Sequence, residues 1–144
     1  RPKNMLLTRT SSGIWRAQSL ATGSQALPGL MVYRFTHSLY YANAQQFVEE
    51  IGALVHQASP PLRWFCLDAA AIDDVDFTAA ETLPALHRHL KAKGVRLVVA
   101  QIMDEMRKKS HYGLQQLFGE DVFYDTLEDV VDDYRQQVGG GASL

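Results

Sequence analysis

An acidic turn near the middle of the chain is the clearest candidate for chemistry. Residues 73–79 read Asp-Asp-Val-Asp-Phe-Thr-Ala, which places the carboxylates of Asp73, Asp74 and Asp76 close together. Such carboxylates could hold a magnesium ion beside a substrate phosphate, or act as acid and base. Asp also favours turns and complements the positive amino end of a helix. No further ligand cluster accompanies the turn, so we favour the structural interpretation and expect no metal.

Two residues that follow the last aspartate leave alternatives open. Thr78 could accept a phosphate, contact a ligand or only cap a helix, and capping is the commonest role of Thr in this position. Phe77 lies between two polar residues at an expected strand end. A large aromatic residue in a turn normally packs inward, but here it could also be an exposed contact for a partner.

The other potentially reactive residues are expected to be ordinary surface or core residues without a chemical role. His87 and His89 are two positions apart on an expected helix, so they point in different directions and make poor joint ligands. Cys66 sits inside an apolar run, where a thiol is a poor nucleophile. A basic patch that is usually solvated, but could face an anion or an acidic partner, contains Arg107, Lys108, Lys109 and His111.

Motifs and composition narrow the function further. The chain has no Walker-type phosphate loop, no G-x-G-x-x-G, no metal-type Cys/His spacing and no G-x-S-x-G, so an enzyme is disfavoured. Its 144 residues predict one domain, and a net charge of −2 from interspersed acids and bases gives no footprint for nucleic acid. A single cysteine suggests a reducing compartment. We see neither a membrane span nor a signal peptide.

A strand and a helix are expected to position the acidic turn. Residues 62–67 are almost continuously apolar, which predicts a strand covered on both faces and ended by Asp68. Thr78 and Glu81 have capping-box spacing, so the helix could begin at Thr78. Pro84 conflicts with that start, because it would lie inside the helix, and the helix could instead kink there or become regular only at Thr82. The turn therefore lies where open α/β sheets receive ligands and partners.

The remaining chain predicts an α/β fold with one mostly parallel or mixed sheet of about five strands and about four helices. Residues 1–12 are polar and basic without a period and suggest a linker, whereas residues 139–144 suggest a flexible tail. Asn43, Thr78 and Thr126 are the expected helix caps, and Gly94 the expected helix stop. Further strands are expected at residues 13–20, 30–35, 95–100 and 122–124, and further helices at 43–58, 104–111 and 127–138.

Three segments resemble a known family. They read PGLMVYRFTHSLYYANAQQF (28–47), LRWFCLDAAAIDDVDFTAAETL (62–83) and VFYDTLEDVVDDY (122–134). Together they resemble the STAS domain, the fold shared by anti-sigma-factor antagonists and sulfate transporters, and specifically the C-terminal STAS domain of SulP-type anion transporters. The resemblance covers about residues 13–137, and the opening RPKNMLLTRT looks like the linker after the last transmembrane helix.

The resemblance implies a non-catalytic regulatory and assembly domain on the cytoplasmic side of the membrane. Residues 1–12 would be the linker from the membrane domain, residues 13–138 the STAS domain and residues 139–144 the tail. Partners would be the membrane domain of the same transporter, a cytosolic protein or a nucleotide bound weakly, and a second copy. No other cofactor is implied. The regulatory turn that would bind ligand or partner contains Asp74, Asp76, Phe77, Thr78 and Ala79.

One position of that turn departs from the antagonist pattern. In the antagonists the turn reads Asp-Ser-[Ser/Thr]-Gly, and a kinase phosphorylates the first serine. Aligning Asp76 on that aspartate places Phe77 at the acceptor position, so switching by phosphorylation there is in doubt. A free-standing partner-switch protein is the main alternative to the transporter domain, and Phe77 argues against it. A phosphohydrolase is the third hypothesis. About ten or more hydrophobic spans encoded upstream of Arg1 would support the transporter, since each span needs about 20 residues.

Overall fold

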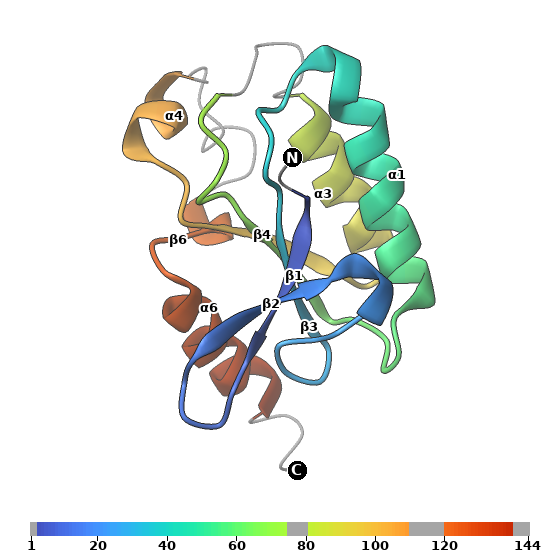
Figure 1. Cartoon of the computed structure of the whole chain (residues 1–144), viewed down its shortest axis with the longest axis vertical. Helices are drawn as coiled ribbons and strands as arrows, with labels where there is room; N and C mark the ends of the chain where they lie inside the picture. Colours follow the sequence, from blue (N-terminus) through green and yellow to red (C-terminus); the bar gives the residue numbers. More distant parts are fainter. Residues whose placement is uncertain (1–2, 75–80, 110–119, 140–144) are drawn as a thin grey trace.

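The computed structural model describes residues 3–74, 81–109 and 120–139. Within them a six-stranded mixed sheet has the order β2-β1-β3-β4-β5-β6 (Figure 1). β1 is antiparallel to β2 and β3, and the strands from β3 to β6 are parallel to one another. The strands are β1 (Met5–Arg9), β2 (Trp15–Ser19), β3 (Leu30–Arg34), β4 (Trp64–Asp68), β5 (Arg96–Ala100) and β6 (Phe123–Tyr124).

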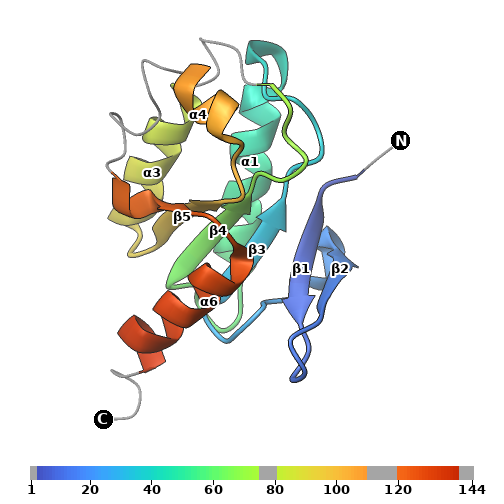
Figure 2. The same ribbon diagram turned by 90° about the vertical axis from the view of Figure 1, so that its left-hand side faces the viewer.

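Helices cover both faces of the sheet. Two long helices, α1 (Tyr41–Gln57) and α3 (Thr82–Ala92), lie side by side on one face, and α6 (Leu127–Tyr134) lies on the other (Figures 1 and 2). α4 (Asp104–Lys109) follows β5. Shorter turns are η1 (Leu20–Thr22), η2 (Glu120–Val122) and η3 (Arg135–Gly139), the last of which continues α6 as a π turn.

The central strands are apolar on both faces because each face has its own core. Met31 and Tyr33 of β3 belong to the cluster under α1 and α3, whereas Leu30 and Val32 belong to the cluster under α6. Successive side chains of a strand point to opposite faces, so both sets must be hydrophobic. The predicted α/β fold class with a mostly parallel or mixed sheet is therefore confirmed, with one strand more than expected.

The additional strand comes from residues that we expected to be a linker. Met5–Arg9 forms β1, which lies inside the sheet between β2 and β3 rather than outside the domain. Leu6 and Leu7 are buried on opposite faces of the sheet, 0% and 3% exposed. A hairpin partner and the neighbouring β3 supply the backbone hydrogen bonds, so two leucines are enough to seat a strand that lacks a clear sequence period.

Helix α1 begins two residues before the expected cap. Tyr40 occupies the N-cap position, and Asn43 lies inside the first turn. Asn43 still organises the helix start, because its Oδ1 accepts from the Tyr40 N–H at 2.9 Å and its Nδ2 donates to the Ser38 carbonyl at 2.8 Å. Asparagine can therefore stabilise the free donors of a helix start from the third helical position, as the acidic residue of a capping box does.

Two expected boundaries of the later helices, the stop at Gly94 and the cap at Thr126, are confirmed. α3 is regular from Thr82, so Pro84 lies in the first turn, where a missing N–H costs little. The Thr78 cap lies outside the described residues. Hydrogen bonds from Gly94 N to Lys91 O and from Val95 N to Leu90 O confirm the predicted helix stop. Thr126 caps α6 as predicted, since its Oγ1 accepts from Asp129 N at 3.0 Å.

Candidate functional site

A buried carboxylate ties together the carboxyl ends of the three central parallel strands. Asp68, the last residue of β4, is 0% exposed. Its oxygens accept from Arg34 Nε at the end of β3 (2.7 Å), from Gln101 Nε2 just after β5 (2.8 Å) and from the Ala70 N–H (3.0 Å). A buried charge needs such partners. The edge on which the acidic turn is built therefore has a fixed geometry.

Sequence reasoning identified Asp68 only as the end of an apolar run. It missed Arg34 and Gln101, which lie 34 and 33 residues away in the chain. The signal that could have found Arg34 is register, because Arg34 pairs directly with Asp68 when the two apolar runs are aligned. Gln101 is recognisable only from the structure, since the strand pairs Ala100 with Asp68 and leaves Gln101 beyond the ladder.

The acidic turn is described as far as Asp74. The Ser38 hydroxyl donates to Asp73 Oδ1, and the Leu39 N–H donates to the Asp74 carbonyl at 2.9 Å. Both contacts join the turn to the segment between β3 and α1, while the side chains of Asp73 and Asp74 stay at the surface. Asp73 thus has a structural contact. The other predicted site residues, Asp76, Phe77, Thr78 and Ala79, lie outside the described residues.

No group of three or more His, Cys, Asp or Glu side chains among the described residues could hold a metal ion. Cys66 is fully buried, and burial raises the pKa of its thiol, with the nearby Asp68 charge acting in the same direction. Burial also lowers the pKa of His87. The side chains of Arg107, Lys108 and Lys109 lie outside the described part, as does His111.

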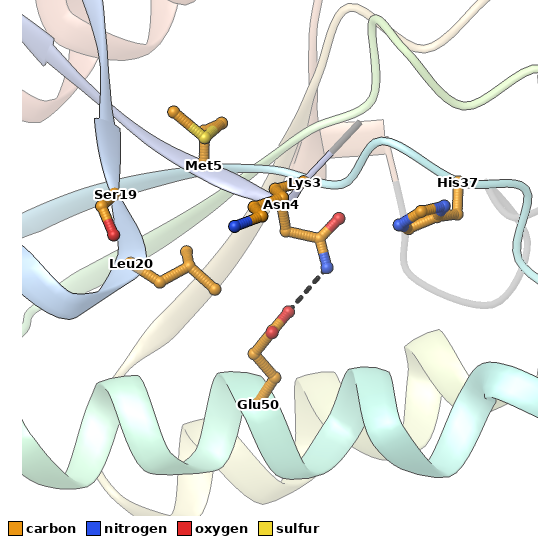
Figure 3. Close-up of a pocket in the computed structure, with 7 residues that line it drawn as sticks. All are labelled: Lys3, Asn4, Met5, Ser19, Leu20, His37 and Glu50. Atoms are coloured by element: carbon orange, nitrogen blue, oxygen red, sulfur yellow. Dashed lines mark hydrogen bonds between the residues drawn. The ribbon is translucent and has the colours of Figure 1, made fainter. Parts of the chain in front are cut away.

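Two hollows on the α1 side were not foreseen from the sequence. A groove of about 750 Å³ runs between α1 and α3, and Val48, Ala85, Leu86 and His89 are among its lining residues. A second hollow, of about 560 Å³, lies between the start of β1, the end of β2 and α1 (Figure 3). It is lined by Lys3, Asn4, Met5, Ser19, Leu20, His37 and Glu50. Residues that meet there come from segments far apart in the chain, so no local motif marks it.

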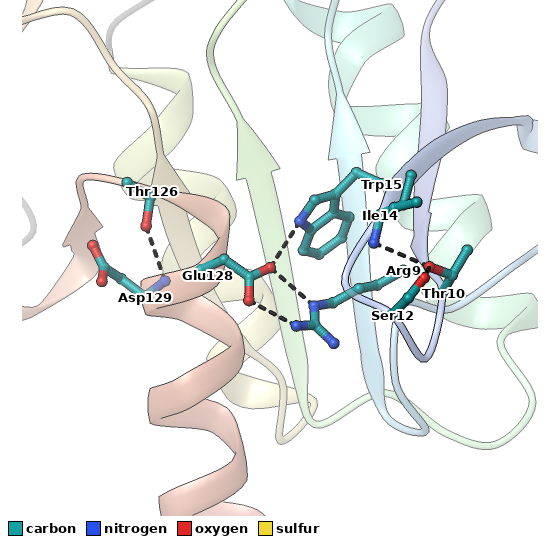
Figure 4. Close-up of polar contacts among 8 residues, drawn as sticks. All are labelled: Arg9, Thr10, Ser12, Ile14, Trp15, Thr126, Glu128 and Asp129. Atoms are coloured by element: carbon teal, nitrogen blue, oxygen red, sulfur yellow. Dashed lines mark hydrogen bonds and ion pairs between the residues drawn. The ribbon is translucent and has the colours of Figure 1, made fainter.

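On the opposite face a polar cluster fastens the β1–β2 hairpin to α6. Arg9 donates from Nε and Nη2 to the two carboxylate oxygens of Glu128, at 2.9 and 2.8 Å, and Trp15 Nε1 donates to the same carboxylate at 2.9 Å (Figure 4). The hydrogen bond from Arg9, with a smaller one from Trp15, lowers the pKa of Glu128. Two-point pairing of guanidinium and carboxylate fixes orientation as well as distance.

A family model described as STAS domain matches residues 24–132, which is well over half of the chain. The chain belongs to the STAS domain family. Two matched relatives are probable sulfate transporters from two strains of Mycobacterium tuberculosis, each 30% identical over 115 residues. That alignment covers 79% of this STAS domain but only 20% of each relative. The chain therefore spans about a fifth of the length of those relatives.

Solved structures agree on the STAS fold. The murine Solute Carrier 26 family member A9 anion transporter matches with a TM-score of 0.79 and 17% identity, over 94% of this chain and 22% of that one. The STAS domain of a SulP transporter from Vibrio cholerae matches with a TM-score of 0.64 and 18% identity, over 84% of this chain and 94% of that one. The anti-sigma factor antagonist SpoIIAA matches with a TM-score of 0.60 and 16% identity, over 78% of this chain and 94% of its own. None of the helices in the described residues is long and apolar enough to cross a membrane.

Proposed function

We propose that this STAS domain is a non-catalytic regulatory and assembly domain of a SulP-type secondary anion transporter, on the cytoplasmic side of the membrane. The observation that carries the proposal is the 30% identity over 115 residues to probable sulfate transporters. Sulfate or a related anion would cross through a membrane domain of the same protein, which would be the first partner of the STAS domain. No cofactor is required, and a second copy of the chain is a further candidate partner.

The comparisons differ in how much of the chain they cover, and the β1–β2 hairpin is the part that the family model leaves out. The family model begins at residue 24, so it leaves the hairpin out. The murine anion transporter covers 94% of the chain, which leaves about nine of 144 residues unmatched, fewer than the hairpin contains. The match to SpoIIAA covers 78% of this chain, although it includes 94% of SpoIIAA itself. At these identities the likeness concerns the fold alone, and coverage does not separate the two classes, because a sulfate transporter family protein from Wolinella succinogenes covers 77% of the chain.

We place the regulatory contact at the turn that includes Asp74 and residues 76–79. Asp68 holds the strand end before this turn, and the Leu39 N–H holds the Asp74 carbonyl. A turn built on a fixed edge can present its backbone and side chains to a cytosolic protein or a nucleotide without reorganising. Phe77 stands where the antagonists carry their phosphorylated serine, so we infer a docking role rather than phosphate acceptance.

The alternative is a free-standing partner-switch protein of the antagonist type, which the match to SpoIIAA supports. Membrane fractionation of the source cells separates the two proposals. With an antibody against this chain, a transporter domain remains with the membranes through salt and carbonate washes and is released only by detergent. A partner-switch protein appears in the soluble fraction as a band near the 16.1 kDa of the chain, and that result would overturn the transporter proposal.

The regulatory contact needs its own test in the intact protein. Phe77→Asp should change the rate of uptake of labelled sulfate, or of the anion that proves to be carried, while the amount of protein in the membrane stays constant. Glu49→Gln, an exposed change on α1, is the matched control and should leave uptake unchanged. Identical uptake in Phe77→Asp and the native protein, at equal amounts, would contradict a regulatory role for the turn.

A further inference from the structure

The hollow beside β1 contains a carboxylate that accepts hydrogen bonds only from neutral groups in the described part of the chain. Glu50 of α1 is half-buried, and its Oε2 accepts from Asn4 Nδ2 at 2.7 Å and from the hydroxyl of Tyr33 (Figure 3). Both donors are neutral. Among the described residues no salt bridge involves Glu50. A partly desolvated carboxylate without a cation is an unfavourable arrangement, and a positively charged ligand would relieve it.

The two donors also determine where the carboxylate points. Tyr33 is 0% exposed, and burial together with the hydrogen bond to Glu50 raises the pKa of its phenol, so it stays a donor. Asn4 is itself held, since its Oδ1 accepts from the Thr36 N–H at 2.9 Å. Both bonds engage Oε2, and Oε1 has no partner among the described residues. Glu50 is therefore oriented in advance, with one oxygen available.

The surroundings of Glu50 combine an apolar wall with an unused polar group. In Figure 3 the side chains of Leu20 and His37 lie on opposite sides of the Asn4–Glu50 contact, and both line the hollow. His37 packs its ring edge-on against Phe35 at 5.6 Å and has no hydrogen bond in the described structure. A smaller hollow of about 120 Å³ continues past Asn4, His37 and Glu50 toward Phe47. The larger volume, about 560 Å³, lies within the usual range for small-ligand sites.

The geometry points to a binding site for a small primary amine with an apolar body. Its ammonium group would donate to Glu50 Oε1, and its apolar part would lie against Leu20. A metal ion is disfavoured because one carboxylate is too few ligands for magnesium or calcium without a substrate. Lys3 lines the hollow as well, and in Figure 3 its side chain lies on the Leu20 side of Asn4. It is exposed, so solvent screens its charge, and no salt bridge joins it to Glu50. This site does not depend on attachment to a transporter.

The test is an NMR titration of the isotope-labelled chain with n-hexylammonium chloride, 1-hexanol and sodium hexanoate. We expect hexylammonium to shift the amide signals around residues 4, 20, 37 and 50, and to bind at least about tenfold more tightly than the alcohol or the carboxylate. Hexanoate or hexanol binding as tightly as the amine would overturn the proposal, since neither supplies a cation to Glu50.

Two variants and one direct contact complete the experiment. Glu50→Gln keeps an oxygen for Asn4 and Tyr33 but removes the charge, and it should weaken amine binding about tenfold or more. Glu49→Gln, next to it on the exposed side of α1, should bind as the native chain does. Intermolecular NOEs from the amine to the Leu20 methyl groups are expected in the native chain, whatever the fate of the variant. Unchanged affinity in Glu50→Gln, or the absence of those NOEs, would overturn the assignment.

Discussion

Glu50 and Glu128 approach the amino-terminal segment from opposite faces of the sheet, and their partners differ. Glu128 of α6 receives two hydrogen bonds from the Arg9 guanidinium and one from Trp15, so its charge is matched (Figure 4). Glu50 of α1 receives only neutral donors and borders a hollow (Figure 3). At the α6 contact the charge of Glu128 is therefore paired within the chain, and the contact attaches the hairpin to α6. The α1 contact leaves a charge that something else can satisfy.

The largest expected loss of stability comes from a substitution at Gly29, where the chain lies against Tyr134 of α6. It tests whether the α6 face of the sheet tolerates an added side-chain atom. Gly29 has φ +87, and a Cβ there would overlap the Tyr134 hydroxyl, which donates to the Pro28 carbonyl. Gly29→Ala should lower the free energy of unfolding by about 2–4 kcal/mol, from backbone strain and overpacking together. Urea denaturation measures the loss.

Gly23→Ala is the matched control for that change. Gly23 also has a positive φ, +61, but nothing lies within 4 Å of the added Cβ. Only backbone strain remains, so we expect a loss of about 1 kcal/mol. If Gly29→Ala and Gly23→Ala lower the free energy of unfolding equally, packing against α6 adds nothing to the cost at Gly29. That result would weaken the contrast between the two faces of the sheet.

Removing the charge of Glu128 should cost stability in a way that depends on pH. Arg9 holds the pKa of Glu128 below its ordinary value of 4.5, so its stabilising effect is present above that value and is lost as the pH falls below it. Glu128→Gln should therefore lower the melting temperature at about pH 7, and the difference from the native chain should shrink as the pH falls below 4.5. High salt should also reduce it, because part of the site is exposed.

Asp129→Asn is the control for the Glu128 variant. Asp129 also lies in the first turn of α6, so both carboxylates interact with the helix dipole, but only Glu128 is paired with Arg9. The control should show a smaller and less pH-dependent change. If both variants behave alike, the dipole rather than the pairing to the hairpin accounts for the effect.

The parts of the fold that could be predicted are those whose signal is local. The apolar runs of β3, β4 and β5, the Thr126 cap and the Gly94 stop depend on neighbours within a few positions. β1 was missed because its stabilising partners are other strands rather than a pattern of its own. Its two leucines, in a segment rich in polar residues, do not distinguish a strand from a linker.

The contacts of the two glutamates could not be predicted, for a related reason. Arg9 and Glu128 are 119 residues apart, and Asn4 and Glu50 are 46 apart. Both depend on β1 being a strand of the sheet, which brings the start of the chain against α1 on one face and α6 on the other. If β1 is interpreted as a linker, the positions of charged and polar residues in the sequence cannot predict either the Arg9–Glu128 or the Asn4–Glu50 contact. The acidic turn, in contrast, could be located because it follows a strongly apolar strand.

The smallest expected effect is that of Glu50→Gln on stability. The glutamine oxygen can still accept from Tyr33 and Asn4, and no cation loses its partner in the described structure, so the free energy of unfolding should change by less than about 1 kcal/mol. Urea denaturation at low salt, beside Glu128→Gln, compares the two carboxylates directly. A loss as large as that of Glu128→Gln would mean that the folded chain already compensates the charge of Glu50. An amine would then have no charge to satisfy, and the two faces would differ in shape but not in chemistry.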